Sequence, residues 1–204
     1  MRAATRAFLF ATVLAAGGRA SAADPAVAKI AASAAASTQT LSDAEVRTRI
    51  DSYLETIDTP IPADRWRALG PGAGAVLEEI AQDRKRLPTR RARAVSALGV
   101  VGSPRARDLM MALAQREDEA AIVRMSAVRA VAPLIEGPAM LETLRPVLER
   151  SRNSRVRATA AEVLVLHAPG LACAPVRKQL ARERPALRPA FARATAGCTD
   201  NNAR

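Results

Sequence analysis

The chain has 204 residues, of which 49% are hydrophobic and only 2% aromatic, with 31 Lys and Arg against 20 Asp and Glu. This length and apolar content suit one folded domain or one small repeat array, not a disordered chain. Three Phe, one Trp and one Tyr are too few for base-stacking platforms or an aromatic-lined pocket, and two Cys with one His exclude a Cys/His zinc site built by this chain alone.

The start of the chain has the pattern of a secretory signal peptide. Two arginines precede an apolar run at residues 7–16, and the triplet ASA at 20–22 fits the small-x-small cleavage rule. A short transmembrane anchor is the alternative, but such a run reaches only about 15 Å as a helix, well short of a bilayer core. We therefore expect cleavage near Ala22 and Ala23, a periplasmic or secreted mature protein, and no membrane-spanning segment in it.

Three segments spaced by 33 residues share one pattern. Each begins with Arg, has Ala three positions later, and has apolar residues at the sixth and seventh positions; a preceding segment also repeats its Leu. The arginines are Arg91, Arg124 and Arg157, and the leucines are Leu77, Leu109 and Leu141. These offsets place the apolar residues on one helical face, with Gly and Pro turns between helices. Because one hairpin cannot bury its apolar face alone, the units must stack.

This pattern resembles HEAT repeats, in their short bacterial form. Asp118, six residues before Arg124, resembles the family's loop Asp that pairs with a second-helix Arg, and Pro146 resembles the family's Pro within the first helix. The resemblance covers about 65–198. It implies an all-α, HEAT-like α-solenoid of about five helical hairpins, with the second helices lining the concave side.

The expected organisation has five parts. They are a signal peptide (1–22), a flexible Ala/Ser/Thr-rich lead (23–41), an N-terminal capping helical hairpin (42–72), HEAT-like repeats (73–198) and a C-terminal tail (199–204). A frayed helix is the alternative for the lead. Ser42 and Glu45 have the spacing of a capping box. Trp66 is expected to seal the core of the capping unit, with a binding-surface anchor as the alternative.

The two cysteines predict a disulfide. Cys173 lies near the start of the last hairpin and Cys198 just past its end, and these two ends meet in an antiparallel hairpin. An oxidising compartment favours the bond. The alternative is a Cys173 nucleophile with His167 as its base, but no Asp or Asn is placed to orient that His. His167 instead falls on the apolar face of its helix, which predicts a buried or half-buried structural role.

Enzymatic signals are weak in this sequence. The carboxylate groups at 78–79 and 117–119 have the character of solvated surface, and the GPGAG segment at 70–74 that of an inter-helix turn, because no strand precedes it and no Lys follows it. We therefore expect no catalytic residues, no metal and no cofactor.

Basic residues gather before the second helices, at 84–93 and 150–157. They suit phosphate contacts, and HEAT-like DNA glycosylases hold DNA on a basic concave face, but the signal peptide and the missing catalytic groups of those enzymes make nucleic acid an unfavoured partner. Solvated faces with inter-repeat Asp–Arg pairs are the plain interpretation. An acidic protein or an anionic envelope polymer is the functional one.

The favoured function is an exported, non-enzymatic scaffold or adaptor with a protein partner. The alternative is an enzyme or a polyanion-binding protein, lyase-like or nucleic-acid-binding, that uses the Arg-rich face. Polar residues two and five positions after each repeat Arg face away from the apolar stripe and are the candidate partner contacts. They are Arg93, Ser96, Ser126, Arg129, Thr159 and Glu162.

Overall fold

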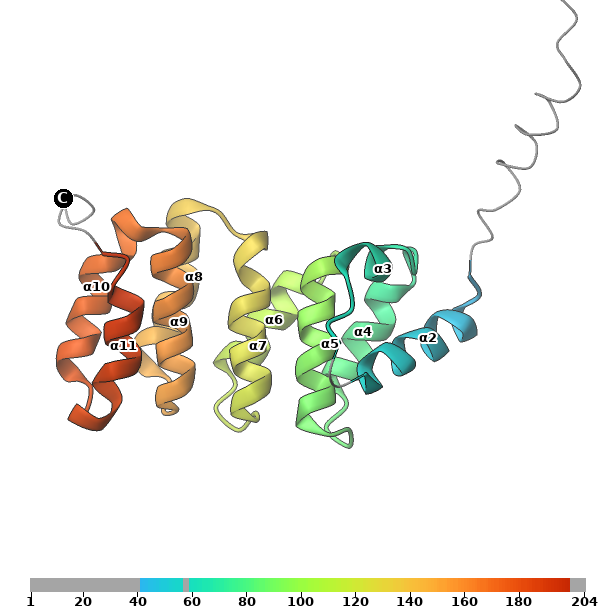
Figure 1. The fold of residues 1–204 in the computed structure, drawn as a ribbon, viewed down its shortest axis with the longest axis horizontal. Coiled ribbons are helices and arrows are strands. Elements are labelled where there is room, and N and C mark those ends of the chain that lie inside the picture. Colours follow the sequence, from blue (N-terminus) through green and yellow to red (C-terminus); the bar gives the residue numbers. More distant parts are fainter. Residues whose placement is uncertain (1–40, 57–58, 199–204) are drawn as a thin grey trace, which may run out of the picture. The chain divides into compact units, whose positions relative to one another are not determined.

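Helices follow one another along the described part of the computed structural model, residues 41–56 and 59–198, and no strand occurs there (Figure 1). The α-helices are α2 (Asp43–Glu55), α3 (Ala63–Arg67), α4 (Ala73–Gln82), α5 (Pro88–Val101), α6 (Ala106–Gln115), α7 (Ala121–Val131), α8 (Gly137–Arg150), α9 (Ser154–His167), α10 (Pro169–Arg182) and α11 (Arg188–Thr195). Two 3-10 helices are η1 (Ala132–Leu134) and η2 (Pro185–Leu187). The predicted signal peptide, the lead up to residue 40 and the tail at 199–204 lie outside the described residues.

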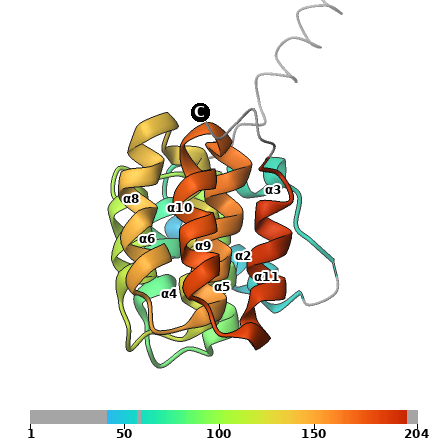
Figure 2. The same ribbon diagram turned by 90° about the vertical axis from the view of Figure 1, so that its left-hand side faces the viewer.

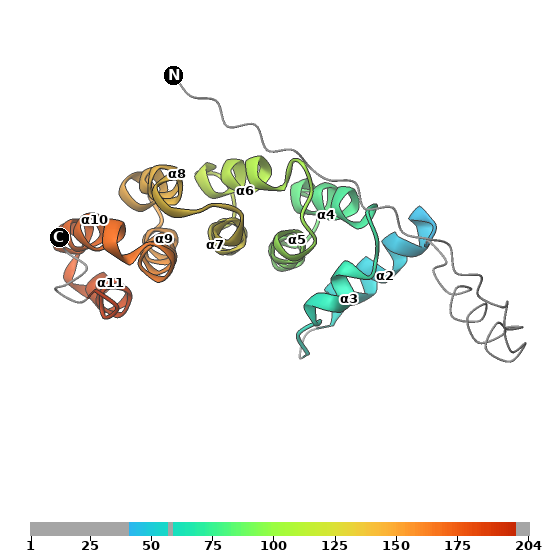
Figure 3. The same cartoon turned by 90° about the horizontal axis from the view of Figure 1, so that it is seen from above.

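These helices form two layers. Viewed from above, α4, α6, α8 and α10 make one row, and α5, α7, α9 and α11 make the second row on the inner side of the curve (Figure 3). Viewed from the end of the array, α8, α6 and α4 lie on one side and α11 on the other (Figure 2). Neighbouring hairpins pack mainly through their second helices, α5 on α7, α7 on α9 and α9 on α11. The prediction of an all-α, HEAT-like solenoid is confirmed.

Local sequence signals fix where several helices begin. The Ser42 hydroxyl accepts a hydrogen bond from the Glu45 backbone N–H at 3.3 Å, and the Glu45 carboxylate accepts one from the Ser42 backbone N–H at 2.8 Å, which confirms the predicted capping box. Asn153 caps α9 by accepting from the backbone N–H groups of Arg155 and Val156. A Pro in the first turn of α5, α8 and α10 suits positions that have no intrahelical partner for an N–H.

The core contains the apolar positions that repeat every 33 residues in the second helices. The three alanines at offset three (Ala94, Ala127, Ala160) and the larger residues at offset seven (Leu98, Val131, Leu164) are fully buried. In the first helices the expected register is only partly met: Leu77 is fully buried, whereas Leu109 and Leu141 are partly buried. There the neighbouring methionines, Met110 and Met140, take the buried positions.

Close approach of α5 and α7 depends on a glycine. A Cβ at Gly99 would lie 3.0 Å from both the Cβ and the carbonyl oxygen of Ala130, so a larger residue would force the two helices apart. Gly102 ends α5 with a φ of 74°, a conformation that glycine adopts without strain, and its N–H donates to Leu98 O at 2.8 Å. Small residues thus set the spacing and the ends of the second helices.

The N-terminal unit is smaller than the hairpins that follow. α2 packs on α4, and the short α3 packs on α5. Trp66 on α3 is 7% exposed and meets Tyr53 edge to face, with 5.2 Å between ring centroids. The prediction that Trp66 seals this end of the core is therefore confirmed.

Candidate functional site

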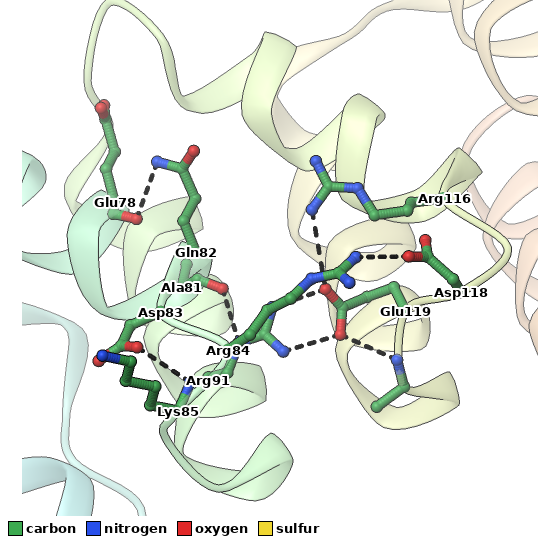
Figure 4. A network of polar contacts seen from close by, with 11 residues as sticks. Glu78, Ala81, Gln82, Asp83, Arg84, Lys85, Arg91, Arg116, Asp118 and Glu119 are labelled. Carbon is green, nitrogen blue, oxygen red and sulfur yellow. Dashed lines mark hydrogen bonds and ion pairs between the residues drawn. The ribbon is translucent and has the colours of Figure 1, made fainter.

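The repeat arginines are structural links between hairpins. Arg91, at the start of α5, donates two hydrogen bonds to the carboxylate of Glu119 in the next hairpin, at 2.8 and 2.6 Å, and a third through Nε to Ala81 O at 2.9 Å (Figure 4). The two charged side chains are 4% and 2% exposed. A buried pair of opposite charges with its hydrogen bonds satisfied ties three chain segments together at one point.

The same link recurs one and two repeats later. Arg124 donates through Nε to Ala114 O at 3.0 Å, and through Nη2 to Glu117 at 2.6 Å and to the Ser151 hydroxyl of the next hairpin at 2.8 Å. Arg157 makes two bonds to Glu183 of the following hairpin, at 2.6 and 2.5 Å. We call the set Arg91, Arg124 and Arg157 the arginine ladder. It joins each second helix to the loop of the next unit.

The pKa values of the acids in this ladder are all lowered, because hydrogen bonds from the arginines outweigh the effect of burial. Hydrogen bonds from Arg157 lower the pKa of Glu183, and those from Arg124 lower the pKa of Glu117. Burial raises the pKa of Glu119, but the hydrogen bonds from Arg91 and from the Ala120 backbone N–H outweigh it, so this pKa also lies below its ordinary value. All three carboxylates are therefore held ionised in the folded protein.

Two expectations about the acidic loop at 117–119 are corrected. Asp118 pairs with Arg84 at 2.8 Å, not with Arg124, whose acidic partner is Glu117. The carboxylates were expected to be solvated surface, but Glu119 is buried. The reason is the ladder: the Glu119 carboxylate accepts two hydrogen bonds from the buried Arg91, whereas Asp118 pairs with Arg84 at the surface.

Ion pairs also occupy most of the first basic run, at 84–93. Arg86 pairs with Asp51 at 2.6 Å and Arg90 with Glu55 at 2.6 Å, so both join α2 to the repeats. Arg93 donates to the carbonyl oxygens of Leu54 and Thr56, each at 2.9 Å, and so closes the C-terminal end of α2. The arginines of this run therefore stabilise contacts between units, as the interpretation of inter-repeat acid–Arg pairs predicted.

The candidate contacts Arg93 and Ser96 lie at the N-terminal end of the second-helix face. Both line a hollow of about 420 Å³ whose wall also includes Tyr53 and Trp66. Ser96 is exposed, and its hydroxyl donates to Ala92 O within α5. Arg93 is only partly exposed because its guanidinium group is engaged with α2.

The candidate contacts Ser126 and Thr159 are less exposed than expected. Ser126 is half-buried on α7. Thr159 is only 4% exposed, and its hydroxyl donates to Arg155 O one turn earlier in α9. The expectation that Thr159 faces away from the core is wrong, because α9 packs against α7 on one side and α11 on the other.

Arg129 and Glu162 are exposed and face each other across α7 and α9, 3.6 Å apart. They line the larger hollow of the second-helix face, about 680 Å³, together with residues of η2 and α11. We call this hollow the C-terminal groove. It brings together three of the six candidate contacts, namely Arg129, Thr159 and Glu162.

One groove residue was missed by the sequence patterns. Arg193 lines the C-terminal groove from α11. It stands five residues after Arg188, the same offset that separates Ser96, Arg129 and Glu162 from their repeat arginines. The last hairpin repeats part of the sequence pattern, because Phe191 lies three positions after Arg188 and is buried like the Ala of the other units. Since Phe replaces Ala at this position, the pattern does not identify the unit as a repeat.

Cys173 and Cys198 form the predicted disulfide, which links α10 to the segment just after α11. Both cysteines of the chain are thereby used, and a Cys173 thiolate nucleophile is not available in this state. His167 was expected to be buried or half-buried, but it is exposed. It is the last residue of α9, and the adjacent Leu166 is 74% exposed, so this turn is uncovered.

The remaining sequence features are structural in the described residues. Glu79 pairs with Arg47, Glu78 accepts from the Ser103 hydroxyl, and Gly70 takes a φ of 83° in the turn before α4. Within residues 41–56 and 59–198, no group of three or more His, Cys, Asp or Glu side chains could hold a metal ion. No described helix is long and apolar enough to cross a membrane.

Comparison with known families agrees with this architecture. The family model of HEAT repeats matches residues 74–165, which extend from α4 to near the end of α9 and include the whole arginine ladder. Comparison with curated proteins and with solved structures gives no match. HEAT repeats generally mediate protein–protein interaction, and the fold is typically a non-enzymatic scaffold. The chain therefore contains HEAT repeats over residues 74–165.

Proposed function

We propose that this protein is a non-enzymatic scaffold or adaptor that binds a protein partner on the face formed by α5, α7, α9 and α11. The observation that carries the proposal is the pair of hollows on this face, of about 420 and 680 Å³, which together include five of the six candidate contacts. A face with recessed, partly apolar sites separated by polar side chains suits a protein surface better than one small ligand.

Two observations support binding over catalysis. The titratable groups with lowered pKa values, such as Glu117 and Glu183, are held by arginines between hairpins and do not face either hollow. Arg129 and Glu162, the charged pair that does line the C-terminal groove, both have exposed side chains. An acid and a base with separated pKa values in a shared pocket would support an enzyme, and neither hollow contains such a pair among its described residues.

Export is part of the proposal. The signal-peptide pattern of residues 1–22 supports it, and so does the disulfide of Cys173 and Cys198, because such bonds persist in oxidising compartments. Fractionation of the producing cells followed by N-terminal sequencing tests it. A mature chain that begins near Ala23 outside the cytoplasm supports export, and an uncut chain in the cytoplasm overturns it.

The scaffold function is tested by affinity capture from an extract of the producing cells with two matched variants. Ser96→Arg with Arg129→Glu changes the second-helix face, and Ala112→Arg with Arg107→Glu makes the same net charge change on exposed positions of α6 in the other layer. We expect a stoichiometric protein partner that the first variant loses and the second retains. A partner lost equally by both, or a bait that carries only a small molecule, would overturn the proposal.

A further inference from the structure

The C-terminal groove is built from three successive second helices. α7 contributes Met125, α9 contributes Ala158, and η2 with α11 contribute Leu187 and Ala190. We call these four partly buried apolar residues the floor of the groove. The hollow is about 680 Å³, which is large enough for several side chains of an extended or helical segment.

The charge around this floor is strongly one-sided. Arg129, Arg155 and Arg193 line the groove, and Glu162 is its single acidic residue in the described part of the chain. Glu162 lies 3.6 Å from Arg129, so that pair neutralises itself. Neither Arg155 nor Arg193 has a carboxylate within ion-pair distance in the described residues, although both side chains are exposed.

This contrasts with the arginines of the ladder and of the 84–90 run. In the ladder and in the 84–90 run, each guanidinium group lies within ion-pair distance of a carboxylate. Arg155 on α9 and Arg193 on α11 have no such partner among the described residues, and apolar residues share the lining of the groove with them. Guanidinium groups in this position suit bidentate contacts to carboxylates.

The rest of this chain does not supply a matching segment. The parts of the sequence outside the described residues contain three acidic residues, Asp24, Asp58 and Asp200, which are far apart in the sequence. These isolated residues do not make an acidic cluster in the sequence that could pair with both arginines.

Resting on the scaffold function proposed above, we propose that the C-terminal groove binds an acidic segment of the protein partner, whose carboxylates pair with Arg155 and Arg193 and whose apolar side chains lie on the floor between α9 and α11. This assigns the partner chemistry and gives Arg193, at the repeat offset of the last hairpin, a binding role.

Fluorescence anisotropy with the mature protein tests the groove directly. The probe is a short fluorescein-labelled peptide of Glu and Leu, with the same peptide in Gln and Leu as the uncharged control. Arg155→Ala with Arg193→Ala removes the two unmatched charges. Arg107→Ala with Arg145→Ala removes two charges from exposed positions on α6 and α8, which have no ion pair among the described residues and lie in the other layer.

We expect the Glu peptide to bind, the groove variant to weaken it at least tenfold, the control variant to weaken it less than twofold, and added salt to weaken it progressively. Equal losses in the two variants, no preference over the Gln peptide, or tight binding of inorganic polyphosphate without the peptide would overturn the proposal. So would dimerisation of the wild-type chain that the groove variant abolishes, because the occupant would then be a second copy. If captured partners depend on the Ser96 and Arg129 variant but not on this one, the scaffold function stands and the acidic segment is rejected.

Discussion

Arg91 and Glu119 lie in adjacent hairpins, 28 residues apart in sequence, and are joined by two hydrogen bonds with both side chains almost completely buried. The link is repeated by Arg124 with Ser151 and by Arg157 with Glu183, at separations of 27 and 26 residues. In a repeat array each unit contacts only its neighbours, so stability depends on these interfaces as much as on the hairpins themselves. The arginine ladder is thus a specific polar addition to the apolar layer between units.

Glu119→Gln should destabilise the protein by about 3–5 kcal/mol, because it leaves the buried guanidinium of Arg91 without a counter-charge. Urea unfolding followed by far-UV circular dichroism measures the change. The neighbouring Asp118→Asn is the matched control, since its ion pair with Arg84 is exposed and is expected to contribute no more than about 1 kcal/mol.

Replacing both partners should cost much less than replacing one. Arg91→Met with Glu119→Leu removes the buried charges together and fills similar volume, so we expect it to recover most of the loss seen in Glu119→Gln. If the double variant is as unstable as the sum of its single substitutions, the pair is not the coupling element between these hairpins.

Acidification should destabilise the fold through the ladder acids. The pKa values of Glu183 and Glu117 lie below their ordinary value of 4.5, because arginines donate to the ionised carboxylates. A lowered folded-state pKa gives stability that is complete above about 4.5 and is lost as the pH falls through the folded-state pKa. Unfolding midpoints should therefore decrease as the pH is lowered through that range. Glu183→Gln should make the midpoint less dependent on pH. A midpoint that rises on acidification would contradict this.

Removing the disulfide should loosen the last hairpin first. Cys173 and Cys198 are 25 residues apart, and a loop of that size contributes about 3.5 kcal/mol in the chain-entropy description. The α10–α11 hairpin packs on α9 alone among the second helices, so we expect faster hydrogen exchange in α11 of a Cys173→Ala, Cys198→Ala variant while α4 to α7 keep their protection. Uniform acceleration along the array would show that the bond stabilises the whole array as one unit.

Gly99→Ala should destabilise the protein by about 1–3 kcal/mol, because its new methyl group would meet Ala130 at 3.0 Å. Gly170→Ala serves as the control. It is also within a helix, it has open space around it, and its substitution should be neutral or stabilising by up to about 1 kcal/mol. Thermal unfolding of both variants measures the difference, and equal effects would argue against close contact of α5 and α7.

The sequence predicts the second helices well because their core positions are local. Ala94 and Leu98 are buried by spacing on one helix, and Ser42 with Glu45 needs only one turn to form its cap. The disulfide was predictable because an antiparallel hairpin brings its two ends together. These features depend on periodicity and short distances, which a single sequence displays.

The interfaces between units could not be predicted in the same way. The acceptor for each ladder arginine changes from Glu119 to Ser151 to Glu183, with a changing separation, so no repeating letter marks it. The burial of Thr159 and the exposure of His167 depend on what covers α9, which its own sequence does not encode. The C-terminal groove escaped notice for a related reason, since Arg193 belongs to the most divergent hairpin.

The central claim is that a protein partner occupies the face formed by α5, α7, α9 and α11, and site-specific photocrosslinking tests it most directly. A benzophenone amino acid is placed at the exposed positions Ser96 on α5 and Arg193 on α11, and at Ala112 on α6 as the reference for the opposite layer. Irradiation in the producing cells should yield one crosslinked protein from Ser96 or Arg193 and none from Ala112. Crosslinks to that protein from Ala112, with none from the other two positions, would contradict the account.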